Sequence, residues 1–236
     1  YSTTAMSAAE KFAAPSLTHW FGTDNFGRDI FSRVMQGCST TLAISLLVVL
    51  FSASAGILLG AVTGYFGGIL DEVVMRVTDA VNGFPSILLT LVIISLLGTG
   101  KQNVIIALGI VFVPSYVRIV RGEFIRLRDA DYIRRARLMG VSGMRILFVH
   151  ILPNIFSVFW VSVIIGLNNA ILAESGMSYL GIGVKPPDAS LGKMLSDAQG
   201  YLQNAPWYAI APGLMIVWIV LGFSLLGEGI RIAMGK

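Results

Sequence analysis

The side chains that most often carry out chemistry in proteins are few in this sequence and lie far apart. It contains one cysteine, Cys38, and two histidines, His19 and His150. A single thiol cannot form an internal disulfide or a thiolate metal cluster, and two distant histidines do not predict a metal site. The HExxH and GxSxG patterns are absent, as are paired carboxylates within the apolar runs. We therefore expect no catalytic residues, metal site or bound cofactor, and a membrane-embedded enzyme is only a remote alternative.

The nearest match to a nucleotide-binding loop is the segment 95–102, which reads SLLGTGKQ. A phosphate-binding loop needs glycine at its first position and Ser or Thr at its last, where the hydroxyl binds magnesium. Here Ser95 and Gln102 occupy those two positions. The chain is therefore not expected to hydrolyse ATP.

The composition is that of a membrane protein. Of 236 residues, 55% are hydrophobic and 13% are charged, whereas soluble domains carry about 25% charged residues. The apolar residues also come in runs near the roughly 20 residues that a helix needs to cross a bilayer. We expect an all-α, polytopic helical bundle.

Five apolar runs are candidates for membrane-spanning helices in this stretch. They cover residues 42–66, 77–97, 104–120, 146–172 and 207–226. An amphipathic stretch precedes the second run, and Pro85 is expected to kink or break it. Pro153 interrupts the fourth run early. In the first run, Gly56, Gly60 and Gly64 recur at four-residue spacing, which predicts a stripe for close helix packing.

The basic residues predict which loops face the cytoplasm. Eight arginines lie between residues 118 and 145, and cytoplasmic loops carry an excess of Lys and Arg. We therefore place the loop 121–145 and the C-terminus in the cytoplasm. The polar segments 1–38 and 174–206 are then external.

Within this loop, residues 131–139 contain no Gly or Pro and predict a short helix of roughly 13 Å. Gly140 suits the turn that ends it. Arg134, Arg135 and Arg137 give this helix a positive charge that a partner or anionic headgroups would neutralise. Eight arginines alone favour an ordinary loop that only fixes topology, but the order of the residues favours a partner. A simple channel, the other remote alternative, would need neither the helix nor its glycine turn.

The order of residues here resembles the coupling loop of binding-protein-dependent ABC importer permeases. The family's usual pattern is E-A-A, three residues, Gly, nine residues and I-x-L-P. It falls here on Arg134, Arg135, Ala136, Gly140, His150, Leu152 and Pro153. Arginine replaces the usual Glu and the first Ala. The positions of Tyr132, Arg137, His150 and Asn154 instead look like the dipeptide/oligopeptide/nickel branch.

Two further stretches resemble the same branch. Residues 19–33 are similar to its external H-x-L-G-T-D-x-x-G-R-D-x-x-S-R segment. Residues 173–187 are similar to the loop before its last span, although Leu191-Gly192 stands where a Trp-Gly pair is usual. The resemblance covers residues 17–236 and is specific at three separated places.

The resemblance implies a C-type permease subunit that forms half of a translocation path. Its partners would be a homologous second permease subunit, two cytoplasmic ATPases that bind ATP and Mg, an external substrate-binding protein and the lipid bilayer, with no nucleic acid. Such a subunit lies in the cytoplasmic (inner) membrane of a bacterium or archaeon. The branch imports small peptides most often, with nickel, metal chelates or opines as alternatives. A first helix would precede this stretch, so that 1–38 follows it, 39–236 is the transmembrane domain and the intact subunit has six spans.

The resemblance also implies that Asp131, Tyr132, Arg134, Arg135, Ala136, Arg137, Gly140 and Pro153 couple the chain to the ATPases. Asn168 and Asn169, late in the fourth run, are candidates for the translocation path. They are equally compatible with hydrogen bonds to a neighbouring helix. Glu174, just beyond them, is expected to hold the following loop in place.

Overall fold

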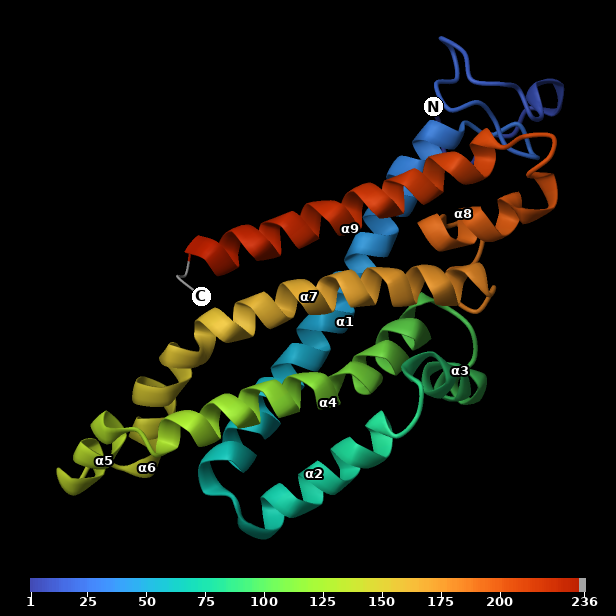
Figure 1. Ribbon diagram of the computed structural model, residues 1–236. Helices are drawn as coiled ribbons and strands as arrows, with labels where there is room; N and C mark the ends of the chain where they lie inside the picture. Colours follow the sequence, from blue (N-terminus) through green and yellow to red (C-terminus); the bar gives the residue numbers. More distant parts are fainter. Residues whose placement is uncertain (234–236) are drawn as a thin grey trace.

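The protein is represented by a computed structural model, in which residues 1–233 are described (Figure 1). Over these residues it is a bundle of helices with no strand beyond one isolated bridge, between Thr23 and Asp29. The α-helices are α1 (Ile30–Phe66), α2 (Gly68–Asn82), α3 (Ser86–Leu97), α4 (Lys101–Arg128), α5 (Asp131–Leu138), α6 (Gly143–Arg145), α7 (Leu152–Tyr179), α8 (Leu191–Ala198) and α9 (Trp207–Ala233). Three short elements join them: η1 (Ala8–Glu10), the π-helical turn η2 (Ile146–Ile151) and η3 (Gln199–Tyr201).

Four helical stretches are long and apolar enough to cross a membrane. They are α1, α4, α9 and the continuous stretch Gly143–Tyr179, which joins α6, the π-helical turn and α7. The pair α2 and α3 becomes a fifth if the two helices are taken as one broken span. The predicted all-α membrane fold is confirmed.

The break expected at Pro85 divides the second predicted span, 77–97, between two helices. Its first residues belong to α2, and α3 begins only at Ser86, with a bend of 93° between the two helices. Pro85 immediately precedes α3 at φ −55°, and a proline disfavours helical geometry in the residue before it. The chain therefore turns sharply at residues 83–85 instead of crossing straight.

Helix α1 packs closely on α4 through the glycine stripe. A Cβ atom at Gly60 would lie 2.8 Å from the Val117 carbonyl oxygen, and one at Gly64 would lie 2.6 Å from the Cβ of Phe124. Gly56 meets Tyr116 in the same way. Glycine at these positions is therefore what lets the two backbones approach.

Both helices are longer than predicted. Helix α1 begins at Ile30, within the segment 1–38, because the Asp29 side chain caps it by accepting a hydrogen bond from the Ser32 amide. Helix α4 continues to Arg128, past the predicted end at residue 120. Its added turns bury Phe124 against the cluster beneath α5, so the first part of the predicted loop 121–145 is helical.

Helix α7 is longer than predicted at its C-terminal end. At its start, the regular helix is interrupted by the π-helical turn directly before Pro153, which lies in the first turn of α7, where a missing N–H costs little. The helix then continues to Tyr179. The predicted external loop 174–206 therefore contains the last turn of α7 and the short helix α8.

The two ends of the bundle are distinct. Helices α5 and α6 lie at one end, toward which the last turns of α9 also point, and the N-terminal segment and α8 lie at the other (Figure 1). Lys101, the first residue of α4, is 3.6 Å from Asp188 in the loop before α8. We call these the α5 end and the α8 end.

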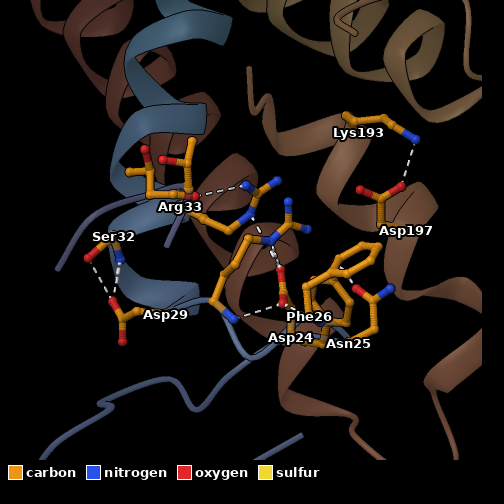
Figure 2. Close-up of polar contacts among 12 residues, drawn as sticks. Asp24, Asn25, Phe26, Asp29, Ser32, Arg33, Lys193 and Asp197 are labelled. Carbon is orange, nitrogen blue, oxygen red and sulfur yellow. Dashed lines mark hydrogen bonds and ion pairs between the residues drawn. The ribbon is translucent and has the colours of Figure 1, made fainter. Parts of the chain in front are cut away.

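At the α8 end, Asp29 connects the N-terminal segment to α1. One carboxylate oxygen is 2.8 Å from Nδ1 of His19, and the other accepts hydrogen bonds from the Ser32 amide and hydroxyl (Figure 2). Burial by itself raises the pKa of the Asp29 carboxyl, but the hydrogen bonds from His19 and Ser32 outweigh it and hold this pKa below its ordinary value. The ionised form is therefore the one that the fold stabilises.

We predict that Gly60→Ala destabilises the protein by about 1–3 kcal/mol, because the new methyl group must push α4 away. Thermal unfolding of the purified protein in detergent measures the effect. Gly222→Ala is the matched control, since no atom lies within 4 Å of a Cβ built there. Equal melting temperatures for the two variants would contradict close packing at Gly60.

We predict that Asp29→Asn lowers stability at pH 7 by about 0.3–1 kcal/mol, the usual contribution of a charge at a helix N-terminus. A carboxyl whose pKa is lowered by folding stabilises the fold above its ordinary pKa, and this stability is lost as the pH falls through the lowered value. The difference from wild type should therefore vanish in strong acid. Unfolding curves between pH 7 and pH 2 check this, with Asp188→Asn as the control for a partly exposed carboxylate that does not cap a helix.

Candidate functional site

Helix α5 lies at the ends of α1, α4 and α7 and is attached by one face. Ile133 is fully buried and Ala136 is nearly so. The two residues are three apart and therefore lie on the same side of the helix. Both belong to an apolar cluster that includes Phe124 of α4 and Ile155 of α7. Direct packing thus connects α5 to the long helices.

Gly140 ends α5 with a Schellman motif. Its φ is +78°, which glycine adopts at little cost. Its N–H donates to the Arg137 carbonyl, and the N–H of Val141 donates to the Ala136 carbonyl, at 3.0 and 3.1 Å. This pattern of two hydrogen bonds is the usual C-terminal cap of a helix. The short helix therefore has a fixed end and keeps one orientation.

The outward face of α5 combines positive charge with exposed apolar side chains. Leu138 and Met139 are 89% and 76% exposed, and Arg134 and Arg135 are exposed beside them. We call these four residues the α5 surface. Large apolar side chains gathered on an exposed face mark interaction sites.

Other residues of the predicted coupling set have different surroundings. The Arg137 guanidinium lies 5.6 Å from the centre of the Tyr65 ring, a cation–π distance, so it attaches α5 to α1. Asp131 occupies the first turn of α5, and Tyr132 beside it is exposed. Pro153 lies in the first turn of α7. The set therefore divides into residues that face outward and residues that hold α5 in place.

Sequence reasoning missed Tyr65. Its hydroxyl would lie 3.1 Å from a Cβ atom at Gly143, and its ring also faces Arg137. One aromatic residue at the end of α1 thus contacts both sides of the turn that follows α5. No signal in the sequence distinguishes it from an ordinary aromatic residue at a membrane interface.

Two ion pairs between α2 and α4 were also missed. Arg121 donates two hydrogen bonds to Asp71, at 2.5 and 2.7 Å, and Arg118 donates one to Asp79, at 2.5 Å. A two-pronged arginine–carboxylate contact fixes orientation as well as position. Arginines that were predicted to mark the cytoplasmic side therefore also hold α2 on the bundle.

A cavity of 680 Å³ opens beside the break between α2 and α3. Its walls combine apolar side chains with the amides of Asn82 and Asn169 and the hydroxyls of Ser86, Ser115 and Ser162. This volume lies in the range of sites that hold small molecules. Asn169 lines this cavity, whereas the amide of Asn168 donates to the hydroxyl of Ser224 on α9, at 2.9 Å.

Glu174 is fully buried near the end of α7. Its carboxylate accepts a hydrogen bond from the Ser178 hydroxyl at 2.7 Å, and that hydroxyl accepts one from the Val184 amide. Nearby, the Leu191 amide donates to the Thr41 hydroxyl of α1. Glu174 therefore sits at the base of the loop that leads to α8, as the sequence predicts.

Over most of its length, the chain matches one known protein family. Residues 56–231 match the family described as binding-protein-dependent transport system inner membrane component. The chain belongs to this family. The predicted family is thereby confirmed, and the relatives that share it are permease subunits.

Two relatives are similar to this chain in sequence over most of its length. It is 40% identical to the dipeptide transport system permease protein DppC of Alkalihalophilus pseudofirmus, over 96% of this chain and 74% of that one. It is 42% identical to the glutathione transport system permease protein GsiD of Escherichia coli O6:K15:H31, over 93% and 73%. These relatives agree with the predicted branch.

Two solved structures share its fold. An inward-facing MetNI methionine ABC transporter chain superposes with a TM-score of 0.72 at 20% identity, over 86% of this chain and 97% of that one. An amino acid ABC transporter crystallised with histidines gives a TM-score of 0.66 at 19% identity, over 86% and 94%. At this identity the likeness concerns the fold alone.

Proposed function

We propose that this chain forms half of the translocation path of an ATP-driven importer of small peptides. The family match over residues 56–231 carries the importer assignment. The names of the relatives, dipeptide and glutathione permeases, support peptides as the substrate class. A homologous permease subunit would supply the other half, and an external binding protein would deliver the substrate.

The α5 surface would dock on a cytoplasmic ATPase subunit, with two such subunits binding ATP and Mg. Leu138 and Met139 suit an apolar groove, and Arg134 and Arg135 suit an acidic rim around it. Arg137, which packs on Tyr65, would orient α5 from within the chain. The α5 end, including the end of α9, then faces the cytoplasm of a bacterial or archaeal cell.

Transport requires that nucleotide binding shift the permease between inward-open and outward-open states. Nucleotide can shift this equilibrium only by as much as its own affinity differs between the two states. If α5 were loosely attached, the free energy of nucleotide binding would move α5 alone and leave the long helices where they are. Helix α5 is instead attached rigidly, because Ile133 and Ala136 are buried and Gly140 caps its end.

The cavity beside the α2–α3 break would form this chain's share of the path. Its mixture of amides, hydroxyls and apolar walls suits a small peptide, whose backbone is polar and whose side chains vary. Asn169 would contact the substrate, and Asn168 would instead hold α7 against α9.

We predict that Leu138→Glu weakens ATPase binding by about 2 kcal/mol, or roughly thirtyfold, because a charge replaces an apolar contact at the centre of the interface. Gly140→Pro should have the same effect, because it removes the left-handed cap. Co-purification of the tagged permease with its ATPases measures binding. Leu17→Glu, an equally exposed leucine at the α8 end, is the matched control. Full retention of the ATPases by both variants would contradict the proposal that the α5 surface docks on them.

We predict that Asn169→Leu lowers peptide uptake in vesicles at least about tenfold, because a polar wall of the path is lost, while the ATPases remain bound. Asn168→Leu should instead lower thermal stability by about 0.6 kcal/mol, the mean for a hydrogen bond between membrane helices, and affect uptake less. Uptake that falls equally in the two variants would mean that Asn169 has no special place in the path.

A further inference from the structure

A second polar pocket, of 470 Å³, lies at the α8 end, far from α5. Its walls come from the N-terminal segment, the first turn of α1, the loop before α8, and α8 with the short helix after it. Arg28 and Arg33 contribute to one wall, and Lys193, Asp197 and Tyr201 to another. We call it the Arg28–Arg33 pocket.

The two arginines share one buried carboxylate. Asp24 is fully buried and lies 2.6 Å from the Arg28 Nε and 3.6 Å from the Arg33 Nε. It also accepts hydrogen bonds from the Phe26 and Arg28 amides. Two positive charges thus face one negative charge. One positive charge on this wall is therefore left without a carboxylate of its own, although the Phe26 ring lies 4.7 Å from the Arg28 guanidinium.

Arg33 is also short of hydrogen-bond partners. The residue is only 2% exposed, and its Nη1 donates to the Thr3 carbonyl at 3.1 Å. Its Nε has no hydrogen-bond partner among residues 1–233. A buried charge is costly unless it is paired and hydrogen-bonded. The Arg33 guanidinium, which lines the pocket, therefore carries a charge that its contacts with Thr3 and Asp24 satisfy only in part.

The opposite wall is balanced in charge. Lys193 donates to Asp197 at 2.6 Å, and Figure 2 shows this pair across from Arg33 and Asp24. Asp188, at the rim, is paired with Lys101. The uncompensated charge of the whole pocket is therefore the single one between Arg28 and Arg33, which matches a ligand with one negative charge.

We propose that the Arg28–Arg33 pocket binds a single carboxylate presented from the external side. Guanidinium groups match the planar fork of a carboxylate, and a monoanion would complete the pairing that Asp24 begins. Two sources supply this chemistry: the C-terminal carboxylate of a small peptide, or an acidic side chain of the external binding protein. The second source rests on the proposed function.

The first arm of the test uses dialanine as the probe and dialanine amide, which lacks the carboxylate, as its control. Calorimetry is done on the assembled transporter in nanodiscs without binding protein. Arg33→Gln should weaken dialanine binding on the order of tenfold, the effect of losing a charged hydrogen bond. Asp197→Asn should tighten it about fivefold, because Lys193 is freed for the ligand. Tighter binding cannot result from misfolding.

Lys11→Gln is the matched control, because it removes one exposed positive charge from the same segment outside the pocket. The second arm measures the affinity of the binding protein for the same four proteins. Opposite shifts in Arg33→Gln and Asp197→Asn in the first arm identify a free carboxylate. The same shifts in the second arm alone identify a side chain of the binding protein.

Unchanged affinity of both variants in both arms would overturn the proposal, as would shifts in the same direction. Co-purification of the ATPases is recorded for every protein. If wild type brings no ATPase, the proposed function fails, while the same calorimetry on the permease chain alone in nanodiscs still reports on the pocket. The two failures are thereby distinguished.

Discussion

The close contact between α1 and α4 is the constraint on which the other elements depend. In lipid the hydrophobic effect does not press helices together, so packing and hydrogen bonds must do so. The stripe of Gly56, Gly60 and Gly64 allows the backbone of α1 to approach that of α4, with Val117 and Phe124 filling the space beside it. Helix α7 then packs on this pair, α5 sits on its end, and α4 provides a wall of the cavity.

This arrangement explains how a helix of only eight residues can serve as a handle. A helix of that length is not stable alone in water. Its order comes from Ile133 and Ala136, which rest on the end of the α1–α4 pair, and from the Gly140 cap. The same glycine stripe that brings α1 to α4 thus supports the surface at which motor subunits are proposed to act. A substitution that disturbs the packing of α1 on α4 would therefore also displace the α5 surface.

Local signals predicted much of this structure, and non-local contacts account for the rest. The long apolar runs and the glycine after residues 131–139 are short-range patterns, and both were read from the sequence. The extension of α4 was not, because Arg121 pairs with Asp71, fifty residues earlier. The start of α1 depends on Asp29 with its partner His19, ten residues away. Asn168 and Asn169 separate because neighbouring residues on a helix point about 100° apart.

The arginines near α5 also make contacts that the sequence did not reveal, and these contacts determine which positive charges remain on the α5 surface. Counting basic residues assigns a side of the membrane but does not say which of them are free. Arg118 and Arg121 pair with carboxylates of α2, and Arg126 pairs with Glu123 on its own helix. Arg128 donates to the Gly64 carbonyl. The positive charge offered outward by α5 is thus concentrated on Arg134 and Arg135, the two positions where the family usually has Glu and Ala. A cognate ATPase groove should therefore place its acidic groups opposite the first half of α5, and its apolar floor opposite Leu138 and Met139.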